Sequence, residues 1–400
     1  MRPVRLLIAV FAAGWICQPG PGTAQDVVVE QLNRVLETAE SAISADFART
    51  MPLPSASAGV SYSFDAVSGN FQRDPATFGQ IYLDRADPLG KGRFNISFTY
   101  QFAKLDELEG RNAGDLEEPL PIPFEGLFAA MQIPAFEIDA EVHSFLMALS
   151  YGFTDDLEAS LALPLIYSDV RIRMELVAAA FDDNAELFVF DDAFGDESDV
   201  VGFGDVLLRL KYRLLEHRQV HAASGVLLRL PSGNDTALHG TGFVEVAPSL
   251  LLSSRVFEPA RWARLQGHFN ATAGLNAEHL DASEARWGVG LDWGVTEEIT
   301  AALAFLGRHP FARIGPAGSF LFPRCNTDVI SCAGDATVRD ASAPLLGLSG
   351  DRADTYTLSI GGRGGLWRDT LFAFANLAVP LNDGFLRTYP IPLVGLEATF

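Results

Sequence analysis

Basic side chains occupy every second position in one short stretch of the chain. Arg209, Lys211 and Arg213 alternate with leucine and tyrosine, and Asp205 stands four residues before the first of them. Because alternate residues of a β-strand point to the same face, the three cations share one face. Such a row can attract an anion in a pore, or it can pair with carboxylates and brace the pore wall. Both interpretations remain open at this point.

Other segments repeat this separation of charged and apolar faces. In 285–295, Arg286 and Asp292 share one face, and Trp287 and Trp293 share the opposite face. We therefore define a set of candidate residues for the inner face of a pore, where they would set selectivity. The set is Arg93, Arg209, Lys211, Arg213, Arg229, Arg264, Arg286, Asp205, Glu245 and Asp292.

Apolar residues with a period of two define the strands that carry these charges. In 93–102, five apolar residues from Phe94 to Phe102 share one face and polar residues share the other. Trp287 and Trp293 lie six residues apart, or about 20 Å along a strand. This spacing is typical of the aromatic girdles at the two membrane faces of a β-barrel. The residues assigned to the girdles are Trp287, Trp293, Tyr100 and Tyr212.

These patterns predict an all-β fold in which 55–400 forms a single antiparallel transmembrane β-barrel. We expect about fourteen strands; the first two, near 55–65 and 76–84, have the weakest pattern, and twelve is the alternative count. Short and long connections alternate along the chain, as periplasmic turns and extracellular loops do in such barrels. With an even number of strands both termini are expected on the periplasmic side.

The last stretch, 389–400, alternates apolar and polar residues and closes with Phe400, which we interpret as a signal for the outer-membrane barrel assembly machinery. Pro390 and Pro392 cannot donate ladder hydrogen bonds, so pairing is expected from Leu393 onward. The seam between the first and last strands is therefore expected to be the weakest part of the wall. Lateral exit of a hydrophobic solute near this seam is a hypothesis.

The amino-terminal region is expected to lie outside the barrel domain. Residues 1–24 are predicted to be a secretory signal peptide, because Arg2 and Arg5 precede an apolar run that is too short to cross a bilayer. Residues 25–54 are predicted to contain a periplasmic amphipathic helix and a linker. This helix either remains outside the barrel or enters its mouth as a plug.

Composition limits the remaining chemistry. A net charge of −22 argues against nucleic acid as a partner. Cys325 and Cys332 predict a local disulfide in an exported chain. The acidic segment 182–199 is interpreted as an outer loop near membrane lipid and lipopolysaccharide. The chain contains no G-x-S-x-G, H-E-x-x-H or P-loop motif, and we predict no metal, cofactor or catalytic residue.

Several segments resemble those of a known family. They are YGFTDDLEASLALPL, GFGDVLLRLKYRL, LLRLPSGNDTALHGTG and PLGKGRFNISFTYQF. They are similar to recurring segments of a Gram-negative outer-membrane barrel family associated with the meta-cleavage pathway of phenol degradation and grouped with long-chain fatty-acid transporters. The resemblance covers about 54–400. It implies passage of small hydrophobic or aromatic molecules and offers no catalytic residue set.

The expected function is therefore that of an outer-membrane channel or transporter for small solutes, and not that of an enzyme. One alternative is a structural or surface-interaction barrel without transport, which an interior crossed by ion pairs would favour. A second alternative is an outer-membrane acyl hydrolase, which needs a Ser-His pair on the lipid-facing wall. The sequence does not determine the oligomeric state.

Overall fold

The structure is a computed structural model of the whole chain. It describes residues 44, 46–49, 54–55, 62–65, 70–73, 78–108, 110–113, 116–118, 128–181, 187–217, 219–235, 237–260, 263–278, 280, 283–311, 320–322, 337–339, 354–367, 370–384 and 386–400. The predicted signal peptide, Cys325 and Cys332 lie outside these residues.

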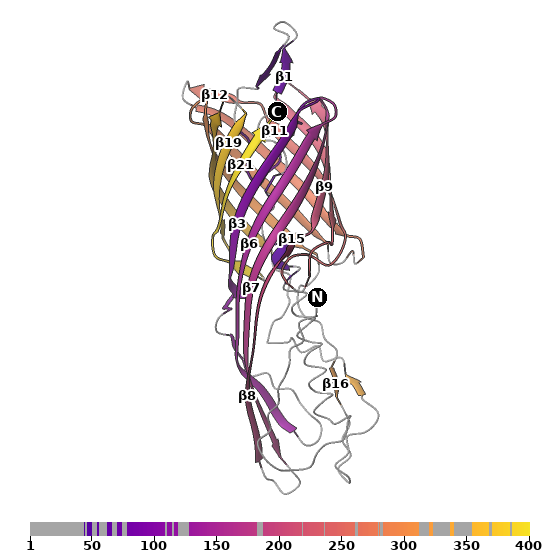
Figure 1. Cartoon of the computed structure of the whole chain (residues 1–400), viewed down its shortest axis with the longest axis vertical. Helices are drawn as coiled ribbons and strands as arrows, with labels where there is room; N and C mark the ends of the chain where they lie inside the picture. Colours follow the sequence, from indigo (N-terminus) through magenta and orange to yellow (C-terminus); the bar gives the residue numbers. More distant parts are fainter. Residues whose placement is uncertain are drawn as a thin grey trace.

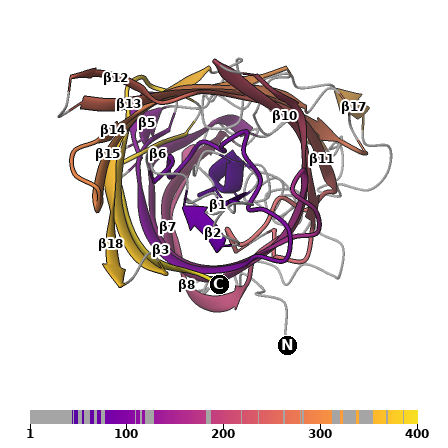
Figure 2. The ribbon, with the colours of Figure 1, turned by 90° about the horizontal axis from the view of Figure 1, so that it is seen from above.

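Twelve antiparallel strands form a closed barrel (Figures 1 and 2). They are β3 (Phe94–Leu108), β6 (Phe128–Gly152), β7 (Leu157–Phe181), β9 (Val206–Glu216), β10 (Val220–Leu230), β11 (Glu245–Ser254), β13 (Ala263–Asn276), β14 (Glu284–Gly294), β15 (Ile299–Pro310), β18 (Thr355–Trp367), β19 (Leu371–Pro380) and β21 (Ile391–Thr399). The other strands are β1 (Tyr62–Asp65), β2 (Asn70–Arg73), β4 (Arg111–Asn112), β5 (Leu116–Glu118), β8 (Leu187–Phe203), β12 (Phe257–Ala260), β16 (Phe320–Phe322), β17 (Thr337–Arg339) and β20 (Leu386–Thr388).

The two ends of the barrel differ in their connections. Short connections join β6 to β7, β9 to β10, β14 to β15 and β18 to β19 at one end, where the carboxy-terminus also lies (Figure 1). We call this the short-turn end and the opposite one the long-loop end. At the long-loop end β6, β7 and β8 extend far beyond the rest of the wall (Figure 1). Among the described residues, no helix is long and apolar enough to cross a membrane.

Alternation along each strand separates an apolar exterior from a polar interior. On β9, Leu208 and Leu210 are 40% and 55% exposed, whereas Arg209 and Lys211 between and after them are 8% and 1% exposed. On β3, Phe98 is exposed and its neighbours Ser97 and Thr99 are buried inside. This is the pattern of a barrel whose outer face contacts lipid and whose inner face is polar.

The seam between the first and last barrel strands is paired on both sides of Pro390 and Pro392. β21 pairs with β3 from Leu393 opposite Gln101 to Thr399 opposite Asn95, and β20 pairs with residues 105–108 of β3, at the long-loop end. The backbone groups of Phe94 and Phe400 exchange two hydrogen bonds of 3.0 and 2.8 Å. Pairing of β21 with β3 thus begins at Leu393, as predicted from the prolines, and lateral exit near this seam stays a hypothesis.

The strand count corrects the prediction of fourteen strands to the alternative of twelve. Only 62–65 of the first predicted strand is described as extended, and it pairs with β2 in a separate two-stranded sheet at the short-turn end (Figure 1). The described part of the second predicted strand, 78–84, is coil inside the lumen. Its alternating apolar residues pack inside the barrel. The backbone N–H of Phe78, and that of Ala86 just after the segment, donate to wall side chains.

The described part of the predicted amino-terminal helix also lies in the lumen. Ser44 and Asp46–Arg49 are helical, and Phe47 is 1% exposed. The Ser44 hydroxyl donates to the carbonyl of Gly240 at 3.4 Å. These described residues therefore pack inside the barrel.

A buried ion pair beside the seam generates a prediction about stability. Glu397 accepts a hydrogen bond from the Asn95 amide at 2.9 Å and pairs with Arg363 at 2.7 Å. Glu397→Ala leaves the Arg363 guanidinium buried beside an uncharged residue. We expect a loss of about 3–5 kcal/mol in the free energy of unfolding, measured by urea titration of tryptophan fluorescence in detergent. Thr399→Ala, which removes one neutral hydrogen bond to Asn95, should cost only about 1 kcal/mol; equal losses would contradict the role given to the charge.

Candidate functional site

A coil segment enters the lumen at the short-turn end, reverses direction and returns to begin β3. We call this segment, residues 78–92, the plug. Glycines with positive φ stand near both of its ends: Gly79 (53°), Gly90 (96°) and Gly92 (74°). This backbone conformation is strained for other residues. The glycines therefore allow the chain to reverse where it enters and leaves the barrel.

The two ends of the plug bind the wall beside the short turns. The Phe78 ring packs against Phe372 with centroids 5.1 Å apart, and the Phe78 N–H donates to Thr300 Oγ1 at 3.1 Å. At the other end the Leu89 N–H donates to Glu158 at 2.8 Å. Each of these three wall residues is the second residue of its strand. Both ends of the plug are thus fixed at the same rim.

The middle of the plug carries its charged contacts. Asp84 forms an ion pair with Arg209 of β9 and accepts a hydrogen bond from the Ser55 hydroxyl. Asp87 contacts the imidazole of His221 on β10. Burial raises the pKa of Asp87, but the hydrogen bond to His221 and the nearby cations outweigh it and hold the pKa at about 2. Asp87 is therefore ionised when the plug is docked against the wall.

The structure separates the row of cations predicted from the sequence. Lys211 is almost fully buried and lies 3.1 Å from Glu158. It also donates to the Asp87 carbonyl at 3.1 Å, so it supports the plug from the wall. Arg213 lies at the rim and pairs with Asp156 at 2.7 Å. Only the first two cations of the row face the plug.

Two other predicted cations also lie at the rim. Arg264, at the start of β13, donates to the carbonyl of Thr296 in the turn between β14 and β15. Arg93 directly precedes β3. Both residues thus lie at the edge of the lumen rather than in its centre.

The long-loop end of the lumen is closed by ion pairs with the amino-terminal helix. Arg308 of β15 donates to Asp46 at 2.6 Å and to Glu284 at 2.7 Å. Arg49 lies 4.0 Å from the same Glu284. All four side chains are buried. Removing a charged group from water is costly unless it is paired, so these contacts fix the helix in place.

The predicted residues Arg229, Arg286, Glu245 and Asp205 join this network. Glu245 lies between Arg286, with which it forms an ion pair, and Arg229, at 3.5 Å. Arg229 lies 3.8 Å from Asp205. This pairing matches the interpretation in which the inner charges brace the wall. Within the described ranges, no cluster of three or more His, Cys, Asp or Glu side chains is arranged to hold a metal ion.

The connection between β10 and β11, which we call the cap loop, folds inward over this end. Asp205 accepts hydrogen bonds from the backbone and hydroxyl of Thr241, both at 2.9 Å, and from the Gly233 N–H at 3.1 Å. His239 contacts the Ser168 hydroxyl at 3.0 Å, and burial lowers the pKa of His239. The predicted residue Asp205 therefore anchors a closure of the lumen.

A Ser-His-Asp set occurs inside the barrel. Ser253 lies 3.0 Å from His268 Nδ1, and His268 Nε2 lies 3.0 Å from Asp292. Both outer members hold the plug: Ser253 accepts the Ala86 N–H at 2.9 Å, and Asp292 accepts the Gln80 amide at 2.5 Å. Ser253 is fully buried beneath the plug backbone. The set faces the lumen, not the lipid-facing wall that the hydrolase alternative requires, and it serves here as a docking surface for the plug.

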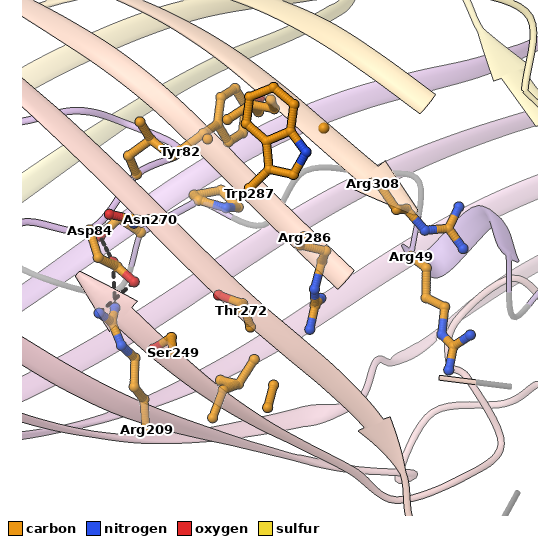
Figure 3. A pocket seen from close by; sticks show the side chains of 18 of the residues that line it. Arg49, Tyr82, Asp84, Arg209, Ser249, Asn270, Thr272, Arg286, Trp287 and Arg308 are labelled. Atoms are coloured by element: carbon orange, nitrogen blue, oxygen red, sulfur yellow. Dashed lines mark hydrogen bonds and ion pairs between the residues drawn. The ribbon is translucent and has the colours of Figure 1, made fainter. Parts of the chain in front are cut away.

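Between the plug and the amino-terminal helix lies a chamber of about 210 Å³ (Figure 3). Tyr82 and Asp84 of the plug, Arg49 of the helix and residues of eight wall strands line it. Figure 3 shows Arg209 reaching Asp84, with Asn270 beside them, and Arg286 and Arg308 nearby. The chamber is thus enclosed partly by wall and partly by the segments that fill the lumen.

Part of the inner wall is apolar. Leu146, Ala148, Ala162 and Leu207 form a buried cluster, and Leu227 packs against it. The last three of these also line the chamber. An apolar inner patch departs from the polar lumen expected of a water-filled barrel. The chamber therefore combines an apolar side with a charged side.

The structure separates the predicted girdle residues into two pairs. Trp293 and Tyr212 are exposed and stand near the short-turn end of their strands. Trp287 donates to His309 at 2.8 Å, and the Tyr100 hydroxyl contacts His143 at 2.8 Å. Trp287 and Tyr100 are half-buried, and Trp287 is also among the residues that line the chamber, so the girdle assignment stays a prediction.

The residues that sequence reasoning missed belong to the plug and the helix. Tyr82 and Asp84 fell in a segment interpreted as a weak strand, and Asp87 in the stretch that follows it. Asp46 and Arg49 fell in a helix placed outside the barrel. Two signals were available: Pro88 and three glycines interrupt the segment 78–92. Such residues favour turns and disfavour a strand that spans a membrane.

Comparison with known proteins finds no matching family model and no matching curated protein. Among solved structures, the chain is similar to an outer membrane channel from Pseudomonas putida F1 (12% identity, 80% of this chain and 100% of that chain, TM-score 0.44). It is also similar to the NanC porin (8% identity, 77% of this chain and 98% of that chain, TM-score 0.35). A third similar structure is a FadL homologue from Pseudomonas aeruginosa (10% identity, 77% of this chain and 90% of that chain, TM-score 0.32). No sequence match supports the resemblance to the phenol-degradation family, which stays a prediction.

The architecture itself defines the class of protein. A closed antiparallel barrel satisfies every strand's backbone hydrogen bonds, and an apolar exterior suits a lipid environment. Together with the polar inner face these are the properties of outer-membrane β-barrels. The chain is an outer-membrane β-barrel of twelve strands with described segments of its amino-terminal part inside the lumen.

The charge on Asp87 generates a prediction about pH. The pKa of about 2 in the docked plug is below the ordinary value of 3.8, so ionisation of Asp87 stabilises docking above pH 3.8. This stabilisation is lost as the pH falls from 3.8 towards 2. We expect the conductance of the protein in a planar bilayer to rise over this range. Asp87→Asn should conduct more at neutral pH and show a smaller acid response; an unchanged acid response would contradict the assignment to Asp87.

Proposed function

We propose that this protein is a gated outer-membrane channel for small solutes. The observation that carries the proposal is the chamber within the barrel, which lies between segments that fill the lumen towards each end. At the short-turn end the closure is the plug, and at the long-loop end it is the amino-terminal helix with the cap loop. A solute that crosses this barrel must displace both.

The way the plug is attached supports movement of the plug without unfolding of the wall. Besides its buried apolar residues, the plug contacts the wall through hydrogen bonds and ion pairs, such as Asp84 with Arg209 and Leu89 with Glu158. Polar groups released from such contacts regain hydrogen bonds with water, so their net loss is small. The glycines at Gly79 and Gly90 provide backbone freedom at the two ends.

The apolar inner patch supports a solute with a hydrophobic or aromatic part. Leu207, Leu227 and Ala162 present this patch to the chamber. Burial of apolar solute surface against it is favourable by about 25 cal/mol per Å². We further propose that the short-turn end faces the periplasm and the long-loop end faces lipopolysaccharide, as in barrels of this type.

The filled lumen also favours a second candidate, a structural barrel without transport. Ion pairs such as Arg308 with Asp46 and Lys211 with Glu158 cross the interior. A barrel that never opens would keep the plug docked under all conditions. The two candidates therefore differ in whether the plug must move for the protein to act.

A reversible lock on the plug tests this difference. Ala86 of the plug packs with Ala223 of β10 and both are fully buried, so Ala86→Cys with Ala223→Cys should form a disulfide. We expect the oxidised variant to lose more than 90% of the channel openings recorded in planar bilayers, because the plug cannot leave the lumen. Reduction with dithiothreitol should restore the openings.

The two single-cysteine variants and the reduced and oxidised wild-type protein are the matched controls, and all should open equally. If the locked variant opens as often as its reduced form, plug movement is not the gate. If neither the reduced form nor the wild-type protein conducts under any condition, the structural candidate is favoured instead.

A further inference from the structure

We propose that the central chamber binds a small organic carboxylate with an apolar body, and that this anion competes with Asp84 for Arg209 and so releases the plug. The inference rests on the proposed gated channel and adds the chemical class of its solute. It also names the ion pair through which the solute opens the gate. The fold alone does not imply this coupling. The inference follows from the placement of the charged residues around the chamber.

The chamber has a positive lining in a strongly acidic protein. Among its described lining residues are four arginines and a single carboxylate, Asp84. Three of the arginines, Arg49, Arg286 and Arg308, have acidic partners, but these carboxylates stand outside the lining. The guanidinium groups therefore lie between the chamber and the acids, and an anion inside the chamber meets cations first.

Tyr82 supplies an unsatisfied donor at the same place. Its side chain is 9% exposed and lines the chamber. Within the described part of the chain, the Tyr82 hydroxyl has no hydrogen-bond partner. A buried hydroxyl without a partner costs about 1–3 kcal/mol. A carboxylate oxygen in the chamber would accept this hydrogen bond and remove that cost.

The other side of the chamber suits an apolar body. Ala162, Leu207 and Leu227 belong to the buried apolar cluster of the wall. Arg209 is two residues from Leu207 on the same face of β9, so the cationic and apolar surfaces adjoin. A ligand with a carboxylate at one end and a ring at the other matches this arrangement. A volume of about 210 Å³ limits it to a small molecule.

The position of Asp84 connects binding to opening. Asp84 belongs to the plug, whereas its partner Arg209 belongs to the wall (Figure 3). Both line the chamber. A ligand carboxylate that pairs with Arg209 takes the place of the Asp84 carboxylate, because close approach of two carboxylates is unfavourable. The plug then loses its central ion pair and keeps the Gly79 and Gly90 hinges.

Two substitutions that break the same ion pair distinguish this inference from a structural role. Both Asp84→Asn and Arg209→Gln remove the charge pairing between plug and wall. Benzoate is the probe and benzamide its neutral isostere, with binding to the detergent-solubilised full chain measured by calorimetry. We expect Asp84→Asn to bind benzoate about tenfold more tightly, and Arg209→Gln about tenfold more weakly, than wild type. Benzamide should bind at least tenfold more weakly than benzoate to wild type and respond to neither substitution.

Each outcome decides the inference. Opposite shifts for the two variants support it, and shifts in the same direction, or equal affinity for benzoate and benzamide, overturn it. Retained heat-resistant migration in gels confirms that both variants are folded, and a conservative Arg209→Lys should recover part of the benzoate affinity. If benzoate fails to bind while the cysteine lock still controls conductance, the ligand class is wrong and the gated channel stands. If the lock has no effect, the gated channel itself fails.

Discussion

Charged groups inside this barrel must be paired, and this constraint organises both the wall and what fills it. A buried ion loses its hydration and recovers stability only from partners of opposite charge with good geometry. The wall supplies such partners at two heights. Lys211 and Glu158 form an ion pair next to the plug, and Arg308 and Glu284 form one next to the amino-terminal helix. The lumen segments complete these networks, so their position follows from the charges of the wall.

The plug and the wall differ in how they are held. The wall is a closed ladder of backbone hydrogen bonds, which includes the pairing between β21 and β3. The plug has almost no such ladder and depends on side chains such as Ser253, Thr300 and Glu158. Segments with few backbone ladder bonds open at lower free energy than the elements around them. Movement is therefore expected in the contents of the barrel rather than in its wall.

The chamber exists because two different segments close the lumen from opposite ends. Its lining combines arginines with the apolar cluster around Leu207. Such a combination is typical of sites that bind small molecules, where apolar surface supplies affinity and a few polar groups set orientation. The same aspartate that limits the chamber also docks the plug. The ion pair between Asp84 and Arg209 therefore links occupancy of the chamber to the position of the plug.

The sequence by itself determined which face of each strand is turned outward. The period of two in 93–102 and 285–295 correctly separated Phe98 from Ser97 and Trp293 from Asp292. The twelve stronger strand predictions correspond to the twelve strands of the wall, because each must carry a continuous apolar face over the membrane height. The sequence pattern also placed Arg209, Lys211 and Glu245 inside.

Only the tertiary structure decided the partners of these residues. Alternation specifies a face but not a neighbour, and Arg209 finds Asp84 at a separation of 125 residues. The segment 78–84 was misinterpreted because apolar alternation looks alike whether a segment faces lipid or packs inside a lumen. What distinguishes the two is the backbone: a wall strand must bond to strands on both sides, and the plug bonds to side chains that only the closed barrel brings around it.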